Sequence, residues 1–361
     1  MAMIHIARPG LGQEEKDAVL AVMDSGMIAS GAVVSDFEKA FSTYIGMPCA
    51  VACSSGTTAL ELALRALGIG SGDKVLTTSY SFIASANCAV YVGASPVFTD
   101  IDPTSFLMTP AHVRDALEKH PDIKAIIAVH LFGQPCDMEA IMDIAKQRNL
   151  LVIEDCAQSH GAMFNGKKAG SFGDAACFSF YPTKNMTTSE GGMVLFKDPE
   201  ISEKCRLLVS HGMKERYHHE IIGYNYRMTN IAAAIGIEQL KKLLGYNKAR
   251  QRNAARLNKY IANPLIQTPM ISPGCEHVFH QYTIKAQDRP RLAEYLQSKE
   301  IGYGIFYPLT IPEQKCYAGM GFETSFPCAD TVKEEAISLP VHPALTKEEL
   351  DRIADAVNSF K

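Results

Sequence analysis

The sequence predicts an α/β fold with a mostly parallel, seven-stranded sheet flanked by helices. From residue 50 to about residue 196, short apolar segments alternate with amphipathic helical segments, and this alternation is typical of βαβ units. The chain has 361 residues, of which 47% are hydrophobic, so it can bury a large core and exceeds the usual size of one domain. We expect a large domain at residues 1–245 and a small C-terminal α+β domain at residues 246–361.

The large domain is expected to open with a helical segment and then to supply the strands of the sheet. Its apolar segments lie at residues 49–53, 75–78, 96–101, 125–131, 150–155, 175–180 and 192–196. Helical patterns such as residues 137–148 separate them. A glycine-rich run at residues 68–73 follows a helix and precedes a strand, which reverses the order of a dinucleotide-binding motif. We therefore interpret it as a helix-ending turn.

The C-terminal third begins with helices expected at residues 229–244 and 246–261, followed by strands at residues 278–286 and 337–341. Before these helices, residues 210–227 are polar and aromatic-rich with little periodicity, which predicts a long functional loop. This loop carries adjacent histidines. Because no third ligand follows at a fitting spacing, a solvated or substrate-facing position is favoured over a metal site.

Charge and cysteine content argue against several classes of protein. The 35 Lys+Arg and 39 Asp+Glu give a formal net charge of −4, which provides no general attraction to nucleic acid or anionic membranes. The 10 cysteines are scattered without paired CxxC spacing, so we expect reduced core thiols and no metal centre. No apolar run approaches the roughly 20 residues of a membrane span, and the chain start lacks a signal-peptide pattern. The expected location is the cytoplasm.

Lys184 is the most informative residue of the chain. It follows the apolar strand pattern at residues 175–180 and precedes a Thr-Thr-Ser-Glu-Gly-Gly turn. An ammonium group there is costly to bury unless it is paired or neutralised, and bonding to an aldehyde as an imine removes that cost. A lysine that extends from a strand end into solvent is the alternative for an isolated residue.

Two further segments support covalent chemistry at Lys184. Asp155 ends the buried strand at residues 150–155, where α/β sheets place ligand-binding groups. Lysine and aspartate are the pairing that pyridoxal phosphate (PLP) requires, since the carboxylate keeps the ring nitrogen protonated. The segment 54–60 places Ser, Gly and Thr at a helix start, where free N–H groups can bind a phosphate. Taken singly, these residues also suit helix caps and turns.

The chain resembles the DegT/DnrJ/StrS sugar aminotransferases, which are fold-type-I PLP enzymes that aminate nucleotide-linked keto sugars. The resemblance extends over nearly the whole chain. It rests on residues 6–9, 55–57, 80–84, 155–161, the Lys184 segment, 223–230 and 338–343.

The resemblance implies roles for individual residues. Lys184 forms the internal aldimine, and Asp155 pairs with the ring nitrogen. The other implied cofactor contacts are Ser55, Gly56, Thr57 and Ser179 to the phosphate, Gln158 near the phenolic oxygen, Phe82 on the ring, and Asn225 from the neighbouring subunit of a homodimer. For Phe82, a core position on an amphipathic helix at residues 81–91 is the alternative.

Substrate contacts are expected from position and polarity at Arg8, His160, Arg216, His218, Tyr307 and His342. His160 is assigned either beside the cofactor or near the sugar. Arg216 is a candidate for pyrophosphate binding or a surface salt bridge. Two positions depart from the family pattern. Ser189 stands where many relatives have glycine, and a serine adopts a positive φ less readily. Phe306 stands where many relatives have histidine and cannot bind a sugar hydroxyl.

The implied reaction is transfer of an amino group from L-glutamate to a nucleotide-linked keto sugar, with 2-oxoglutarate as co-product and pyridoxamine phosphate as the intermediate cofactor form. Lys184 moves the proton, and the kinetics are ping-pong. Residues 223–230 are closer to members that aminate C4 of 4-keto-6-deoxy sugars than to those acting at C3. The alternatives are a sugar dehydratase of the family, which characteristically lacks the lysine, a non-catalytic sensor or regulator, and a carbocyclic substrate.

Overall fold

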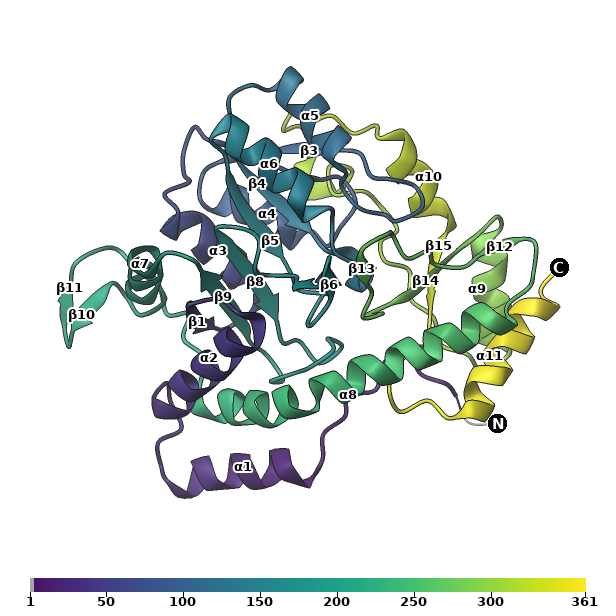
Figure 1. Cartoon of the computed structure of the whole chain (residues 1–361), viewed down its shortest axis with the longest axis horizontal. Helices are drawn as coiled ribbons and strands as arrows, with labels where there is room; N and C mark the ends of the chain where they lie inside the picture. Colours follow the sequence, from purple (N-terminus) through teal and green to yellow (C-terminus); the bar gives the residue numbers. More distant parts are fainter. Residues whose placement is uncertain (1–2) are drawn as a thin grey trace.

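The computed structural model describes residues 3–361 and contains a seven-stranded sheet with the strand order β1-β9-β8-β5-β4-β2-β3 (Figure 1). Strand β9 is antiparallel to both of its neighbours, and all other neighbouring strands are parallel. The strands are β1 (Cys49–Cys53), β2 (Lys74–Thr78), β3 (Ser95–Thr99), β4 (Ile123–Val129), β5 (Leu151–Asp155), β8 (Ala175–Ser179) and β9 (Gly192–Phe196). The predicted α/β fold and mostly parallel sheet are confirmed.

Helices cover both faces of the sheet because its strands are apolar on both sides. In β8, Cys177 packs into the core shared with α3 (Gly56–Ala66) and α7 (Pro199–Val209). The next residue, Phe178, packs into the core shared with α2 (Ala32–Ile45) and α8 (Asn230–Tyr260). This alternation follows from the two-residue period of a strand.

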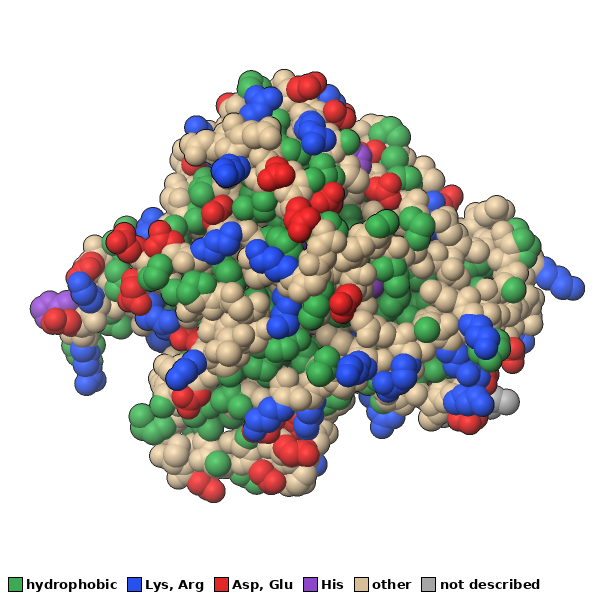
Figure 2. All heavy atoms as spheres, in the orientation of Figure 1, with side chains coloured by type: hydrophobic (Ala, Val, Ile, Leu, Met, Phe, Trp, Pro, Cys, Tyr) green, Lys and Arg blue, Asp and Glu red, His purple; other side chains and the backbone are tan. Residues whose placement is uncertain are grey.

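The remaining helices of the large domain extend these layers. Helix α4 (Ala84–Tyr91) packs beside α3, helices α5 (Pro110–Lys119) and α6 (Met138–Arg148) pack on β3 and β5, and α1 (Gln13–Asp24) packs on α8. Helix α3 ends at Ala66 and is followed by Gly68 at φ 84°, so the glycine-rich run is a helix-ending turn as predicted. Acidic and basic side chains are interspersed over the face shown in Figure 2.

The C-terminal part has its own core around a three-stranded sheet of β12 (Ile266–Gln267), β14 (Tyr282–Ala286) and β15 (Ala336–Leu339). Helices α9 (Arg289–Ser298) and α11 (Lys347–Ser359) supply apolar side chains to this core, and α10 (Pro327–Glu335) precedes β15. A second three-stranded sheet pairs β13 (Cys275–Glu276) with β6 (Met163–Phe164) and β7 (Lys167–Lys168).

The structure corrects two expectations from the sequence, one for helix α8 and one for the segment 210–227. Helix α8 is one helix that continues through Gly245, because a glycine costs a helix only about 1 kcal/mol and buried side chains on both sides hold this one. The segment 210–227 is not entirely loop, since it contains the hairpin of β10 (Met213–Glu215) and β11 (His218–His219), which projects from the body (Figure 1). The division near residue 245 is a proposal in which both parts share α8.

Among residues 3–361, no helix combines the length and apolar character needed to cross a bilayer. The cysteines are unpaired, and several of them are fully buried.

Gly192 brings two strand ends close together. It is the first residue of β9 and pairs with Cys53 at the end of β1 and with Ser179 at the end of β8. A Cβ atom built on Gly192 would lie 2.2 Å from the carbonyl oxygen of Ser55, a distance at which the backbone has to move. Only glycine allows the start of α3 to lie this close to β9.

Replacing Gly192 with alanine is therefore expected to lower the free energy of unfolding by roughly 1–3 kcal/mol. Gly245→Ala is the matched control, because a Cβ at Gly245 meets nothing within 4 Å and alanine favours a helix by roughly 0.5–1 kcal/mol. Denaturant midpoints of the two variants measure the difference. Equal midpoints would show that the approach at Gly192 does not constrain the fold.

Candidate active site

The carboxyl ends of β1, β5 and β8 lie at the same edge of the sheet. Strands β1 and β8 are both antiparallel to β9 and so run in the same direction, and β5 is parallel to β8. Asp155 ends β5, Ser179 ends β8, and α3 begins at Gly56 directly after β1. Ligands of α/β proteins bind at this edge. The structure therefore brings together residues that the sequence separates by about a hundred positions.

Asp155 is buried and held in place by hydrogen bonds. Its side chain is 5% exposed. One carboxylate oxygen accepts from Ser85 Oγ at 2.7 Å, and the other accepts from the Ala157 N–H at 3.1 Å. Sequence reasoning missed Ser85. Its signal was the serine pair Ser81 and Ser85, whose hydroxyls lie 3.1 Å apart at the start of α4.

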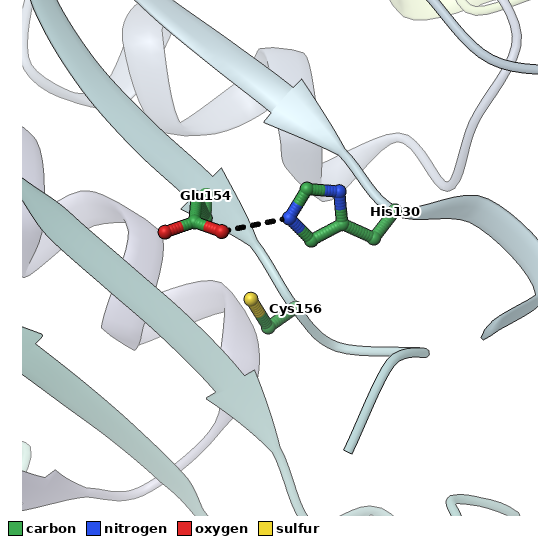
Figure 3. A group of neighbouring side chains, drawn as sticks. All are labelled: His130, Glu154 and Cys156. Carbon is green, nitrogen blue, oxygen red and sulfur yellow. Dashed lines mark hydrogen bonds and ion pairs between the residues drawn. The ribbon is translucent and has the colours of Figure 1, made fainter. Parts of the chain in front are cut away.

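Glu154, the neighbour of Asp155 in β5, points to the opposite side of the strand into a buried group with His130 and Cys156 (Figure 3). Oε2 of Glu154 lies 3.0 Å from His130 Nε2, and its carboxylate also accepts from the N–H groups of Gly170, Phe172 and Gly173. His130 Nδ1 accepts from the Cys136 N–H at 3.1 Å, so Nε2 carries the proton and donates.

Both imidazole nitrogens of His130 are thus used within the protein, and this arrangement serves the structure rather than a metal ion. Burial by itself raises the pKa of Glu154. The hydrogen bonds from His130 and the backbone outweigh that effect and hold the pKa below its usual value. An ionised Glu154 secures the turn between β7 and β8 against β5, and it thereby fixes the strand that carries Asp155.

Lys184 lies half-buried in the loop after β8. Burial lowers its pKa to about 8, although the negative charge of Asp155 acts in the opposite direction. The loop is anchored by Asn185, whose Nδ2 donates to Asn247 Oδ1 at 2.9 Å and to the carbonyl of Val278 at 3.2 Å. A buried amine with a pKa near neutrality is suited to act both as nucleophile and as base.

The turn after Lys184 has a positive φ at Ser189, although serine adopts a positive φ less readily than glycine. Ser189 adopts φ 74°, a left-handed conformation. Its N–H donates to Thr187 Oγ1 at 3.0 Å, and Thr188 Oγ1 donates to the Glu190 carbonyl at 2.7 Å. These hydrogen bonds hold the turn in a conformation that costs a non-glycine residue roughly 1 kcal/mol.

The start of α3 forms a close contact with the end of β8. A Cβ built on Gly56 would lie 2.6 Å from the Cβ of Ser179, so only glycine allows this approach. Ser55 is the N-cap of the helix, and its Oγ accepts from the Thr58 N–H at 3.1 Å. Ser55 is thus a helix cap, which was the alternative expected for this segment. The N–H groups of Gly56 and Thr57 have no partner inside the helix. Together with the Ser179 hydroxyl they form a cradle suited to a phosphate.

Gln158 and Tyr307 close another side of the site. Gln158 Oε1 accepts from the Phe132 N–H at 2.7 Å, and its Nε2 donates to Tyr307 Oη at 3.3 Å. The Tyr307 ring centroid lies 6.0 Å from that of Phe82, which is 53% exposed. Phe82 precedes α4 and is not a core residue. An exposed aromatic side chain at the mouth of a polar site is available to stack on a ring.

His160 is fully buried between two aromatic rings. Its centroid lies 5.3 Å from that of Phe178 and 5.7 Å from that of Phe180. Burial, with a smaller contribution from the charge of Lys184, lowers the pKa of His160 to about 3. The imidazole is therefore neutral, and because the residue has 0% exposure it offers no surface to a sugar in solution. Of the two expected positions, burial therefore favours the one beside the cofactor over the one near the sugar.

Two other expected substrate contacts lie near the N-terminal segment. Arg8 is exposed and lines a cavity that also touches Lys184. His342 is buried, and its Nε2 donates to the carbonyl of His5 at 3.1 Å. His342 thus positions the segment that carries Arg8.

The other three expected site residues lie in or beside the β10–β11 hairpin. Arg216 and His218 belong to the exposed β10–β11 hairpin, and the Arg216 guanidinium lies over its neighbour Tyr217. Asn225 is exposed and forms a β-bridge with Ser210 at the base of that hairpin. Figures 1 and 2 show this hairpin, with histidine and basic side chains near its tip, extending from the body of the molecule.

The family model of the DegT/DnrJ/EryC1/StrS aminotransferases matches residues 9–358 of the sequence. The chain belongs to this family. Its members are PLP-dependent aminotransferases, so the predicted family and enzyme class are confirmed.

Several DegT/DnrJ/EryC1/StrS relatives are similar over almost their whole length. A "Pleiotropic regulatory protein" of Geobacillus stearothermophilus is 39% identical, with 96% of this chain and 95% of the relative covered. A UDP-N-acetyl-3-dehydro-alpha-D-glucosamine 3-aminotransferase of Acidithiobacillus ferrooxidans is 40% identical, with coverage of 93% and 90%. A GDP-perosamine synthase of Caulobacter vibrioides is also 40% identical, with coverage of 98% and 97%.

Among solved structures, DesV of S. venezuelae in complex with a ketimine intermediate has a TM-score of 0.93 and 35% sequence identity, covering 96% of this chain and 94% of that chain. Similarity at this level extends through both the sheet and the C-terminal core. It confirms the fold of this DegT/DnrJ/EryC1/StrS family member independently of its strand pattern.

The amine of Lys184 is expected to titrate with a midpoint near pH 8 in the cofactor-free protein. Reductive methylation of Lys184, read from peptide mass spectra across a pH series, measures this midpoint. Asp155→Asn should move it to lower pH, because the Asp155 charge favours the ammonium form. Labelling of the exposed Lys39 in the same digest corrects for reagent concentration. A midpoint that Asp155→Asn leaves unchanged would mean that the two side chains do not interact.

Proposed function

We propose that this chain transfers an amino group from L-glutamate to a keto sugar linked to a nucleoside diphosphate, with PLP as cofactor. The observation that carries the proposal is the placement of Lys184, in the loop after β8, and of the buried, hydrogen-bonded Asp155, at the end of β5, at the carboxyl edge of the same sheet. Family membership and the substrates named for the relatives support it.

The residues at this edge fit PLP. Asp155 would pair with the ring nitrogen, and Gln158 would approach the phenolic oxygen. The N–H groups of Gly56 and Thr57, with the Ser179 hydroxyl, would hold the phosphate, because glycine at position 56 leaves room between α3 and β8. When bound, PLP draws electrons from the carbon that carries the transferred amine and so makes its proton removable.

Lys184 is the proton carrier of the proposed reaction. With a pKa of about 8, a useful fraction of its amine is neutral near pH 7.5, and that fraction can accept a proton from the donor's α-carbon. The resulting ammonium group can pass this proton on, and in the second half of the reaction the amine accepts a proton again and gives it to the sugar carbon. Burial favours the neutral amine of Lys184, and the charge of Asp155 favours its ammonium form. Lys184 needs both effects to accept and release a proton.

The site is completed by a second copy of the chain in this proposal. Asn225 is exposed, and the neighbouring Ile222 is 88% exposed. An exposed apolar side chain beside a site residue is suited to contact with another subunit. The proposed assembly is a cytoplasmic homodimer in which Asn225 reaches the partner's phosphate cradle.

The proposed sugar is a 4-keto-6-deoxy sugar, on the similarity of residues 223–230 to members acting at C4. One close relative is named as a 3-aminotransferase, so the position of the keto group has to be tested directly. The name of another relative suggests a regulator as the second candidate function. The presence of both Lys184 and Asp155 favours catalysis, because binding alone does not need a lysine of lowered pKa.

The function is tested by absorption spectroscopy of the PLP-loaded protein. L-Glutamate should remove the visible band, and one member of a panel of nucleotide-linked 3-keto and 4-keto sugars should restore it and yield an amino sugar. Asp155→Asn should retain cofactor but slow turnover by roughly 100-fold or more, since the ring nitrogen loses its partner.

The spectra also separate the alternatives. A band that glutamate leaves unchanged, together with retained cofactor, would contradict the donor assignment and support the regulator. Turnover of Asp155→Asn at the wild-type rate would remove Asp155 from its proposed role.

A further inference from the structure

A cavity of about 210 Å³ lies behind the loop that carries Lys184. Four segments line it: residues 7–10 near the N-terminus, residues 182–187, the side of α8, and residues 343–344. Its volume is below the range of about 300–1,000 Å³ that is usual for pockets of drug-sized ligands. The cavity therefore suits a small molecule or one end of a larger one.

The walls of the cavity are held by internal hydrogen bonds. Gln239 on α8 donates to the Gly10 carbonyl at 2.7 Å, and its Oε1 accepts from the Thr187 N–H at 3.4 Å. Tyr246 donates to the same Gly10 carbonyl at 3.0 Å. These bonds join the N-terminal segment to the lysine loop through α8, so the cavity is formed in advance of binding.

The charged side chains that line the cavity are all basic. They are Arg8 at the N-terminal segment, Lys184, and Arg250 on α8. Within the part of the chain that the structure describes, no aspartate or glutamate lines the cavity. A cavity with this lining attracts an anion.

Arg250 is the least expected of the three. It is 6% exposed, and its Nη1 donates to the carbonyls of Phe279 and His280, both at 3.2 Å. Its Nε has no hydrogen-bond partner among residues 3–361, and no carboxylate within that range forms an ion pair with it. A buried guanidinium without an anion is costly, whereas one that binds a carboxylate in two hydrogen bonds is stabilised.

Among the described residues, the groups around Arg250 supply no negative charge that would balance its guanidinium. Burial lowers its pKa to about 10, so it remains a cation at neutral pH. Burial, followed by the charges of Lys184 and Arg250, moves the pKa of His280 well below its usual value, so His280 is neutral and supplies no counter-charge. Its Nδ1 faces Asn185 Oδ1 at 3.3 Å.

We propose that this cavity binds a carboxylate of the amino donor, with Arg250 as the inner contact and Arg8 as the contact at the mouth. The inference rests on the proposed aminotransferase function, because the donor must be held by a carboxylate while its α-carbon proton faces Lys184. Guanidinium groups match carboxylates in geometry. The cavity volume of about 210 Å³ favours a small dicarboxylate over a nucleotide.

Calorimetric titration of the PLP-loaded protein with glutarate tests the site without catalysis, because glutarate has the two carboxylates of the donor but no amine. Arg250→Met should weaken glutarate binding by roughly 10- to 100-fold, the range for hydrogen bonds to charged groups. Arg8→Met should weaken it less, since Arg8 is exposed. Arg252→Met is the control, because Arg252 is exposed on the same helix and does not line the cavity.

Butyrate and inorganic phosphate distinguish the ligand class. Binding of phosphate with no binding of glutarate would overturn the assignment to a donor carboxylate. Equal glutarate affinity in wild type, Arg250→Met and Arg8→Met would overturn the site itself. If Arg250→Met does not fold, Arg8→Met and the titration of wild type still decide the question, because a wild type that binds no glutarate contradicts the proposal.

The outcome is separable from that of the proposed sugar substrate. If no nucleotide-linked keto sugar is accepted but glutarate binding depends on Arg250, the proposed function fails and the carboxylate site stands. If a keto sugar is aminated while glutarate binding ignores both arginines, the function stands and the site fails.

Discussion

The close approach at Gly192 is the constraint on which the site depends. This residue pairs with Cys53 on one side and Ser179 on the other, and it has no room for a side chain beneath the carbonyl of Ser55. Because β9 is antiparallel to both neighbours, it allows β1 and β8 to run in the same direction with one strand between them. The start of α3 and the end of β8 then meet, with Gly56 against Ser179, and a phosphate cradle forms where both strands end.

Strand β5 serves the site through two consecutive acidic residues with different tasks. Glu154 is ionised inside the protein because His130 and three backbone N–H groups bind it. It holds the structure and is not available for chemistry. Asp155 points to the other side, where two hydrogen bonds orient it and leave its charge to act on Lys184. Because successive side chains of a strand point to opposite faces, the structural carboxylate of Glu154 and the site carboxylate of Asp155 can be neighbours in sequence.

The sequence was sufficient to predict the sheet, and it also placed Lys184 and Asp155 at strand ends, since both features leave local signals. Apolar runs identified the strands, and the residues at their ends identified Lys184 and Asp155. Ser85 left only the weak signal of its pairing with Ser81, and Arg250 left none, because each lies on a helix distant in sequence from Lys184. Gly245 suggested a helix boundary, and Ser189 left the conformation of its turn undetermined. In both cases the surrounding contacts outweigh a local backbone preference of about 1 kcal/mol. The conformation at these two positions thus follows from tertiary packing and not from the intrinsic propensity of glycine or serine.

The account centres on the claim that this edge of the sheet holds PLP through Lys184, Asp155 and the start of α3. A crystal structure of the protein after PLP loading and borohydride reduction measures this most directly. We expect a single covalent bond from Lys184 Nζ to the cofactor, the ring nitrogen at the Asp155 carboxylate, and the phosphate at the N–H groups of Gly56 and Thr57. Attachment to another lysine, or a phosphate bound away from α3, would contradict the account.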